Sequence, residues 1–331
     1  MSAPVIGIDL RPTTVAVAPL RDGRLAEPRV QPTERSQAAA LIDQLAAMVE
    51  SARTDDVRGV GIGVPRIVDF ETGRVVSTSR PASPATNGAV ELPLADVPLR
   101  QVLEERLGVP VFVDSDANVG ALAEAHDEAL EPVVRHLVML AVGMGVAGGL
   151  VLGGRIYRGA SGAAGELGHT ILGLDLAGAV PAPMGFPQPG SLDFVASGHA
   201  LDRLATVAGR LYPESALARY RAEGKPVLGS HVIEAALDGD KSAARMVEIW
   251  GQRIGIGVAN AIHTFDPEEV VIGGEAARAD ALLLEPARRV ALEYVLPGLG
   301  ARTTIRLARH RGNAGLIGAA LLARCELEPS T

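Results

Sequence analysis

The chain has 331 residues and a mass of 34.3 kDa, a length typical of two domains or one large one. Hydrophobic residues make up 47% and charged residues 21%, a composition typical of folded globular proteins that argues against disorder. The net charge of −8 and the aromatic content of 3% argue against a basic surface for a phosphate backbone and against aromatic platforms for bases, so we expect no nucleic-acid partner.

The sequence contains one cysteine, Cys325. An intrachain disulfide and a cysteine-rich zinc site are therefore excluded. The residues before the first apolar run, Met1 to Pro4, lack the basic segment of a secretion signal, so we expect a cytoplasmic protein. The uncharged run Leu137–Gly154 is about as long as the shortest membrane-spanning helices, but its six glycines weaken a helix and favour two strands around a glycine turn. We expect no membrane association.

The first part of the chain predicts strands that alternate with helices. Four short apolar runs bounded by turn residues are expected to form strands: Val5–Leu10, Thr14–Leu20, Gly59–Val64 and Val109–Val113. Residues 36–52 carry apolar side chains at helical spacing, with Ser36 as the expected N-cap. Residues 99–107 form a second expected helix, which ends at Gly108.

Polar residues follow the fourth of these strands. Asp114, Asp116 and Asn118 stand directly after it and open a helix expected to run to about Leu130. Side chains at a strand-to-helix junction lie at the carboxyl end of the sheet, where α/β folds bind ligands. The alternative is that Asp114 or Asp116 is simply the N-cap of the helix, because aspartate is favoured at that position.

The second part of the chain repeats the plan of the first. Leu137–Val142 and Gly148–Leu152 predict another hairpin, and Val270–Ile272 predicts a strand that ends at Gly273 and Gly274. Helices are expected over residues 194–209, 231–237, 243–265 and 314–322, the last of them amphipathic. This repetition predicts two α/β lobes with a cleft between them: residues 1–120 with 312–331, and residues 121–311.

Several short motifs are spread over most of the chain. They are Ile6–Asp9, Gly61–Pro65, Pro98–Arg100 with Gly108–Val111, Asp116–Asn118, Gly159–His169, Phe265–Pro267 and Val271–Gly274. This combination resembles the ROK family, which contains repressors and sugar kinases. The resemblance implies the family's fold, a two-lobed α/β fold of the ribonuclease H-like (actin/hexokinase-like) kind with an interlobe cleft. Fold alone does not decide activity.

The resemblance also implies roles for several polar residues. In the family's kinases, the aspartate at the position of Asp116 is the general base that takes the proton from the attacking sugar hydroxyl. The positions of Asn118, Glu166, His169 and Asp193 bind sugar hydroxyls. The alternative for His169 is a buried histidine without a ligand, and the alternative for Glu166 is a place in a turn.

The region after His169 departs from the family. Many ROK proteins hold zinc with the histidine at this position and three cysteines just downstream. The corresponding residues here, 182–193, include no cysteine, so we expect no structural zinc. The family's glutamate that follows the last cysteine and also contacts sugar is replaced by Asp193, which is one methylene shorter.

The first phosphate loop departs as well. The family reads Asp-x-Gly-Gly-Thr-Lys, whose glycines let backbone N–H groups approach phosphate, and this chain reads Asp9-Leu10-Arg11-Pro12-Thr13-Thr14. The resemblance gives Asp9 the position that holds magnesium through water. Arg11, Thr13 and Thr14 are expected to face the ATP phosphates. Pro12 removes an N–H donor, whereas Arg11 is able to act as a charge clamp on phosphate.

The second phosphate loop, Gly-Thr-Gly-Ile-Gly in the family, is also altered. Here it reads Gly143-Met144-Gly145-Val146-Ala147. Met144 replaces a hydroxyl that would bond phosphate, while Gly143 and Gly145 are kept. Gly273 and Gly274 complete the set of residues expected to contact ATP.

Two functions remain open at this point. The first is an ATP- and magnesium-dependent kinase of a hexose, amino sugar or related cyclitol, which the retained Asp116 favours. The second is a sugar- or sugar-phosphate-binding regulatory protein without ATP turnover, which Arg11, Pro12 and Met144 favour. No helix-turn-helix segment precedes the first strand, which argues against a DNA-binding repressor. Apolar helices and low charge predict a homodimer, as is common in the family.

Overall fold

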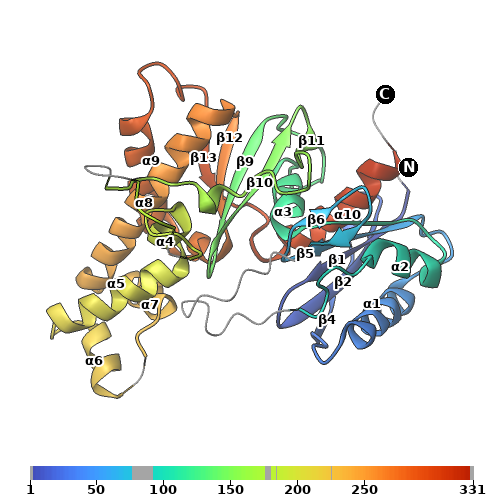
Figure 1. The fold of residues 1–331 in the computed structure, drawn as a ribbon, viewed down its shortest axis with the longest axis horizontal. Helices are drawn as coiled ribbons and strands as arrows, with labels where there is room; N and C mark the ends of the chain where they lie inside the picture. Colours follow the sequence, from blue (N-terminus) through green and yellow to red (C-terminus); the bar gives the residue numbers. More distant parts are fainter. Residues whose placement is uncertain (1–2, 77–91, 176–179, 184, 225, 329–331) are drawn as a thin grey trace. The chain divides into compact units, whose positions relative to one another are not determined.

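The computed structural model describes residues 3–76, 92–175, 180–183, 185–224 and 226–328. Contacts group the chain into two compact units (Figure 1). Unit 1 comprises Met1–Arg135, Gly149–Gly165 and Gly312–Thr331, and unit 2 comprises His136–Gly148 and Glu166–Arg311. The expected division placed residues 121–135 and 149–165 in the C-terminal lobe, whereas their contacts place both in unit 1. Met1 and Ser2, which precede the first apolar run, and Met184 of the cysteine-free region lie outside the described residues.

Unit 1 is built on a mixed sheet. The strands of this unit are β1 (Val5–Leu10), β2 (Thr14–Arg21), β3 (Arg24–Leu25), β4 (Arg29–Pro32), β5 (Gly59–Val64), β6 (Val68–Asp69), β7 (Arg74–Val75), β8 (Val111–Ser115) and β11 (Arg155–Ile156). Strands β6 and β7 form a separate two-stranded sheet, and β11 belongs to another sheet. Its helices are α1 (Ala38–Ala52), α2 (Leu99–Leu107), α3 (Asp116–Glu124) and α10 (Ala314–Leu327). The main sheet has the order β3-β2-β1-β5-β8, with β4 also paired to β2. Strand β1 is antiparallel to β2 and parallel to β5, which is parallel to β8.

The side chains of β1 alternate between the two faces of this sheet. Ile6 and Ile8 are buried in the cluster to which α1 and α2 contribute. Val5 belongs to the cluster of α3 and α10, because successive side chains of a strand point to opposite faces. Asp9 therefore lies on the α10 side. In agreement, a Cβ added to Gly315 of α10 would lie 2.7 Å from Cγ of Asp9.

The last helix, α10, is apolar on all sides rather than amphipathic, so that prediction is wrong. Its residues from Leu316 to Ala323 are all buried, and the helix packs against β1, β5 and α3. A Cβ at Gly318 would lie 1.7 Å from the carbonyl oxygen of Val119 in α3, so only glycine fits there. A helix that packs on every side is expected to be apolar all round.

Two helix boundaries near α3 and α1 differ from those predicted. The α3 helix ends at Glu124 rather than near Leu130, because Asp127 accepts the N–H groups of Ala129 and Glu131 and holds a turn. The expected N-cap Ser36 is wrong, since α1 has Gln37 as its N-cap, without a side-chain hydrogen bond. The predicted end of α2 is confirmed: Gly108 adopts a left-handed conformation with φ of 65°.

Unit 2 combines strands of a mixed sheet with a helical layer. Strands β9 (Leu137–Val142) and β13 (Thr304–Leu307) both pair in parallel with β12 (Glu269–Gly273). Strand β10 (Val146–Leu152) begins in unit 2 and ends in unit 1, where it pairs antiparallel with β11. The helices are α4 (Leu192–Ala196), α5 (Gly198–Leu211), α6 (Ala216–Ala222), α7 (Gly229–Leu237), α8 (Lys241–Phe265) and α9 (Ala281–Tyr294). Within the described ranges, short 3-10 helices cover Leu167–His169, Gly274–Ala279 and, at the boundary between the units, Arg311–Asn313.

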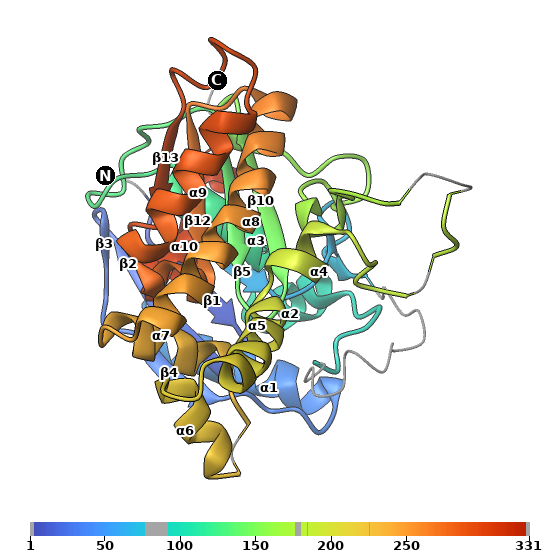
Figure 2. The same cartoon turned by 90° about the vertical axis from the view of Figure 1, so that its left-hand side faces the viewer.

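The long helix α8 organises the helical layer of unit 2. It packs against α9, α7 and α5, and α8 and α9 run side by side (Figure 2). The indole Nε1 of Trp250 in α8 donates to the carbonyl oxygen of Ala196 at 2.7 Å. The helix predicted over residues 194–209 is in fact two, because Ser197 ends α4 and caps α5. No helix among the described ranges is both long and apolar enough to cross a lipid bilayer.

Candidate functional site

The predicted site residues form five local groups, two in unit 1 and three in unit 2. In unit 1 they lie at the β1–β2 turn (Asp9, Arg11, Thr13, Thr14) and at the start of α3 (Asp116, Asn118). In unit 2 they lie in the β9–β10 turn (Gly143, Met144, Gly145), around the first 3-10 helix and α4 (Glu166, His169, Asp193), and at the end of β12 (Gly273, Gly274).

Asp116 lies at the start of α3 but is not the N-cap of this helix. Ser115 is the N-cap, and its Oγ accepts the N–H of Asn118 at 3.2 Å. Asp116 is the first residue of the helix and is exposed. Its negative charge is favourable at the positive end of the helix dipole. The capping alternative for Asp114 and Asp116 is therefore wrong.

Asp114, just before this helix, holds a buried polar network. Its Oδ1 accepts Nδ2 of Asn118 at 2.8 Å, and its Oδ2 accepts Nε of Arg158 at 2.6 Å. Arg158 also donates to Oε1 of Glu326 at 3.0 Å and lies over the ring of Phe70, 3.5 Å from its centroid. A charge buried with several partners is held in one geometry. This network fixes the carboxamide of Asn118.

Asn118 carries an unsatisfied acceptor. Its side chain is buried, and its Oδ1 is the one buried side-chain oxygen or nitrogen without a hydrogen-bond partner within the described ranges. A buried polar atom without a partner costs about 1–3 kcal/mol. A ligand hydroxyl that donates to Oδ1 would recover this free energy, so Asn118 is suited to bind a hydroxyl group.

Asp9 is bound by an arginine. Its side chain is only 5% exposed, and its Oδ2 lies 2.6 Å from Nη2 and 2.8 Å from Nε of Arg11. Burial raises the pKa of the Asp9 carboxyl above its ordinary value, and the Arg11 charge opposes that rise. Magnesium prefers one or two accessible carboxylates together with water. The enclosed and paired carboxylate of Asp9 does not fit this requirement.

Glu166, His169 and Asp193 lie together in unit 2. Nε2 of His169 is 3.8 Å from Oε2 of Glu166. Burial raises the pKa of Glu166, the charge of His169 opposes this, and the charge of Asp193 adds to it. Burial also raises the pKa of Asp193, against a hydrogen bond from the Val146 N–H and the charge of His169. Carboxylates with raised pKa values beside a histidine are typical of functional sites.

Asp193 also fixes the β9–β10 turn. Its Oδ2 accepts the N–H of Val146 at 3.1 Å, and a Cβ at Gly145 would lie 2.9 Å from that oxygen. On the other side of the loop, the carbonyl oxygen of Gly143 accepts the N–H of Gly198, the first residue of α5, at 2.7 Å. The loop is therefore held from both sides, and the Met144 side chain is 62% exposed.

Packing explains Gly274 at the end of β12. It has a φ of 74°, and a Cβ there would lie 2.5 Å from the carbonyl oxygen of Val142. The neighbouring Gly273 lies close to the Met139 side chain. These glycines let the end of β12 approach β9.

His169 contacts an aromatic ring of the cysteine-free region that follows it. The rings of His169 and Phe186 meet edge to face with centroids 5.5 Å apart. The described residues contain no group of three or more His, Cys, Asp and Glu side chains able to hold a metal ion.

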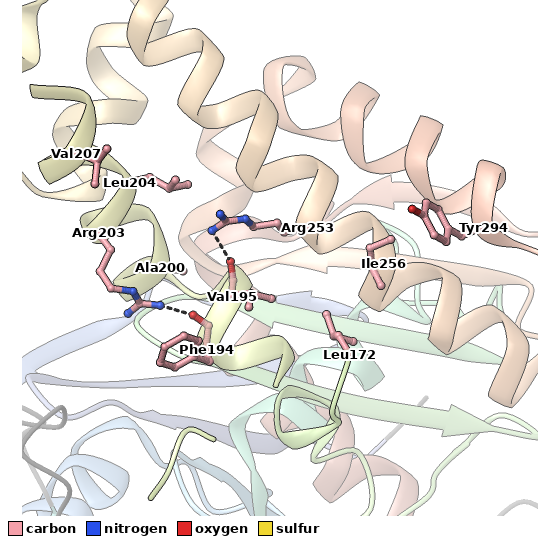
Figure 3. Close-up of a pocket in the computed structure, with 10 residues that line it drawn as sticks. All are labelled: Leu172, Phe194, Val195, Ala200, Arg203, Leu204, Val207, Arg253, Ile256 and Tyr294. Carbon is pink, nitrogen blue, oxygen red and sulfur yellow. Dashed lines mark hydrogen bonds between the residues drawn. The ribbon is translucent and has the colours of Figure 1, made fainter. Parts of the chain in front are cut away.

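Unit 2 also contains a cavity of about 620 Å³ that none of the predicted site residues lines (Figure 3). Leu172, Leu204, Val207, Ile256 and Tyr294 are among the side chains that line it. Arg203 and Arg253 extend into the same region and donate to the carbonyl oxygens of Phe194 and Val195 at the end of α4 (Figure 3). Cations are favourable at a helix C-terminus, so both arginines have a structural role.

The sequence did not identify Arg158 as part of a site. It stands 44 positions after Asp114 in the salt bridge between them, and no local pattern links two residues so far apart. The Tyr157-Arg158 pair directly before the Gly159–His169 motif was its only signal.

Comparison with known proteins agrees with this geometry. The sequence model of the ROK family matches residues 5–326. The chain is 30% identical to a glucokinase of Halalkalibacterium halodurans, over 96% of this chain and 94% of the relative. It is 31% identical to an N-acetyl-D-glucosamine kinase of Aliivibrio fischeri, over 90% and 91%.

A solved structure covers nearly all of the fold. The structure of a ROK family glucokinase from Streptomyces griseus in complex with glucose and AMPPNP superposes with a TM-score of 0.76 at 29% identity, covering 97% of this chain and 99% of that one. The predicted α/β, actin/hexokinase-like fold class is confirmed. The chain belongs to the ROK family.

Proposed function

We propose that the protein is an ATP-dependent kinase that phosphorylates a hydroxyl of a hexose or N-acetylhexosamine. The observation that carries this proposal is the start of α3, where Ser115 takes the capping role and Asp116 stays exposed. Relatives that match over nearly their whole length are named glucokinase and N-acetyl-D-glucosamine kinase, which supports the same substrate class here.

Asp116 acts as the general base. Its carboxylate takes the proton of the sugar hydroxyl while the hydroxyl oxygen attacks the γ-phosphorus of ATP. The bond between that phosphorus and the β–γ bridging oxygen breaks, and ADP leaves with the electron pair. The products are a sugar phosphate and ADP, with the proton on Asp116 until it passes to solvent. Phosphoryl transfer otherwise depends mainly on positioning and on charge stabilisation.

The sugar is held by hydrogen bonds. Asn118 offers the buried acceptor Oδ1 to a hydroxyl, with its carboxamide fixed by Asp114. Glu166, His169 and Asp193 supply two carboxylates and an imidazole for other hydroxyls. A site built from buried polar groups rejects a sugar that lacks a matching hydroxyl, because an unpaired group is costly.

ATP is held through its phosphates. The β9–β10 turn is kept in place by Asp193 and α5, and Arg11 supplies positive charge at the β1–β2 turn. The carboxylate of Asp9 is enclosed and paired with Arg11, so it does not fit a magnesium ion.

A homodimer stays a prediction, which light scattering on the purified protein tests.

A second candidate is a sugar-binding regulatory protein without ATP turnover. The ion pair between Arg11 and Asp9 and the missing N–H of Pro12 favour it. The two candidates agree on sugar binding and differ in the response to ATP.

A substrate-panel assay tests the kinase. ADP release is measured with glucose, N-acetylglucosamine, mannose and myo-inositol, for the native protein and for Asp116→Ala. We expect sugar-dependent ADP release with one or two of these sugars and its loss in Asp116→Ala, while sugar still raises the melting temperature of the variant. Sugar-induced stabilisation of the native protein without ADP release from any sugar would overturn the kinase and leave the binding protein.

A further inference from the structure

The β1–β2 turn holds a guanidinium beside a buried carboxylate. Asp9 is the next-to-last residue of β1, which is buried throughout, and the exposed Arg11 begins the turn. Nε and Nη2 of Arg11 both bond to Oδ2 of Asp9, at 2.8 and 2.6 Å. An arginine fork is matched to a carboxylate or phosphate oxygen in this way. The guanidinium of Arg11 thus supplies a positive charge at this turn.

The carboxylate of Asp9 is enclosed on its other side. A Cβ at Gly315, in the first turn of α10, would lie 2.8 Å from both carboxylate oxygens of Asp9. A side chain that is 5% exposed, paired on one oxygen and packed against a helix offers little surface to the water shell of a divalent ion. The magnesium role that the resemblance implies for Asp9 therefore disagrees with its surroundings.

Arg11 is fixed at three further points. Its Nη2 donates to the carbonyl oxygen of Gly312 at 2.8 Å, just before α10. Its own carbonyl oxygen accepts the hydroxyl of Thr33 at 2.8 Å, and its N–H donates to the carbonyl oxygen of Thr14 at 2.9 Å. An arginine held at both the backbone and the guanidinium loses little conformational entropy when it binds a ligand.

The guanidinium still has donors to offer. The Arg11 side chain is 51% exposed, and its Nη1 has no hydrogen-bond partner in the part of the chain that the structure describes. Guanidinium N–H groups bind phosphate oxygens by short charge-assisted hydrogen bonds. Pro12, directly after Arg11, has no N–H to give, so Arg11 is the phosphate donor that this turn retains beside Thr13 and Thr14.

We propose that Arg11 is a built-in cation that binds a phosphate group of the nucleotide directly, and that nucleotide binding at this turn needs no divalent ion on Asp9. The proposal rests on the proposed kinase function and deepens it, because it names what replaces the metal's charge. Asp9 is then a positioning residue, which holds the guanidinium of Arg11 in place.

Titration calorimetry with AMPPNP, in buffer with magnesium and in buffer with EDTA, tests the proposal. The native protein is compared with Arg11→Ala and Arg11→Lys. The matched control is Arg21→Ala, which removes another arginine of unit 1 from its ion pair with Asp56 at 2.7 Å. Thermal melting of each variant shows that it is folded, and binding of the sugar found in the substrate panel shows that its sugar site is intact.

We expect the native protein and Arg21→Ala to bind AMPPNP with dissociation constants that agree within about twofold between the two buffers, a difference well below 1 kcal/mol. Arg11→Ala should bind about tenfold or more weakly in EDTA, as expected for a lost charge-assisted hydrogen bond. Arg11→Lys should recover part of this loss, because lysine supplies the charge but not the fork.

Two results would overturn the proposal while sparing the kinase: native binding that is about tenfold or more weaker in EDTA than in magnesium, or Arg11→Ala that binds as tightly as the native protein. Absence of AMPPNP binding in both buffers would overturn the proposal together with the kinase, and the substrate panel would then also show no ADP release.

Discussion

Nδ2 of Asn118 donates to Oδ1 of Asp114 at 2.8 Å, and this bond determines which end of the Asn118 carboxamide is left for a ligand. An amide is able to present either a donor or an acceptor. Here the donor end is bound to Asp114, and the acceptor Oδ1 has no partner in the described residues. The pair therefore selects a hydrogen-bond donor, such as a sugar hydroxyl.

Removing the Arg158 side chain should lower the stability of the fold. Arg158→Met leaves the Asp114 carboxylate, whose side chain is 3% exposed, without its charge partner. Loss of one partner from a buried ion pair costs about 3–5 kcal/mol. We expect the free energy of unfolding in urea to fall by that order, and the sugar KM to rise more than kcat falls.

The double variant Arg158→Met with Asp114→Asn is the matched test of this explanation. It removes both charges and keeps an oxygen for Asn118, so it should regain much of the lost stability. A double variant that is as unstable as Arg158→Met alone would show that the packing of Arg158 on Phe70, and not its charge, matters. Arg155→Met, a change at an exposed neighbouring arginine, serves as the control.

Variants of Asp116 and Ser115 should have different effects, one on the catalytic rate and the other on stability. Asp116→Asn removes the base, and we expect kcat to fall by about 100- to 10,000-fold with little change in melting temperature, because Asp116 is exposed. Ser115→Ala removes the cap and should cost about 1 kcal/mol of stability with a much smaller effect on kcat. If Asp116→Asn kept most of the activity, the assignment of the base would be wrong.

Local patterns predicted much of the fold. The strands β1, β5 and β12 and the glycine at the end of α2 were found because short apolar runs and C-terminal glycines are local signals. The buried α10 was misread as amphipathic because its environment is set by β1, β5 and α3, which lie far away in sequence.

The sequence predicted single residues of the candidate site but not the contacts between them. Motifs located Asp116, Asn118 and Glu166. They did not locate Arg158 or the bond between Asp193 and Val146, because these contacts join segments more than 40 positions apart. The pairing of Arg11 with Asp9 was likewise not predicted, although only one residue lies between them.

Asp193 and Asp240 should have opposite effects on the pH dependence of stability. Burial raises the folded-state pKa of Asp193 above that of the unfolded chain, so its ionisation destabilises the fold as the pH rises through this raised value. Asp193→Asn should therefore raise the melting temperature at neutral pH, with a gain that vanishes at a pH below the ordinary carboxyl range, and should weaken sugar binding.

For Asp240, burial is outweighed by hydrogen bonds from the N–H groups of Ala216, Ala243 and Ser242, and the pKa is lowered. Its stabilising contribution is present above the ordinary carboxyl pKa and is lost as the pH falls through the lowered value. Asp240→Asn should lower the melting temperature at neutral pH and have less effect in acid. Thermal melts across pH check both signs, and equal signs for the two variants would contradict this account.

Treatment with a zinc chelator should leave the melting temperature unchanged. The ring of His169 packs edge to face on Phe186, in the cysteine-free region where other ROK proteins hold zinc. A structural zinc site would contribute directly to folding. Elemental analysis that found stoichiometric zinc in the purified protein, with a lower melting temperature after chelation, would contradict this expectation.

Transfer of a labelled phosphate tests the central claim most directly. The native protein is incubated with ATP that carries ¹⁸O in its γ-phosphate and with the sugar that supports ADP release, and the products are analysed by mass spectrometry. We predict that the label appears in a sugar phosphate in equal amount to the ADP formed, and that Asp116→Asn forms neither. Label recovered only in ATP or inorganic phosphate, although the sugar binds, would contradict the assignment of a sugar kinase.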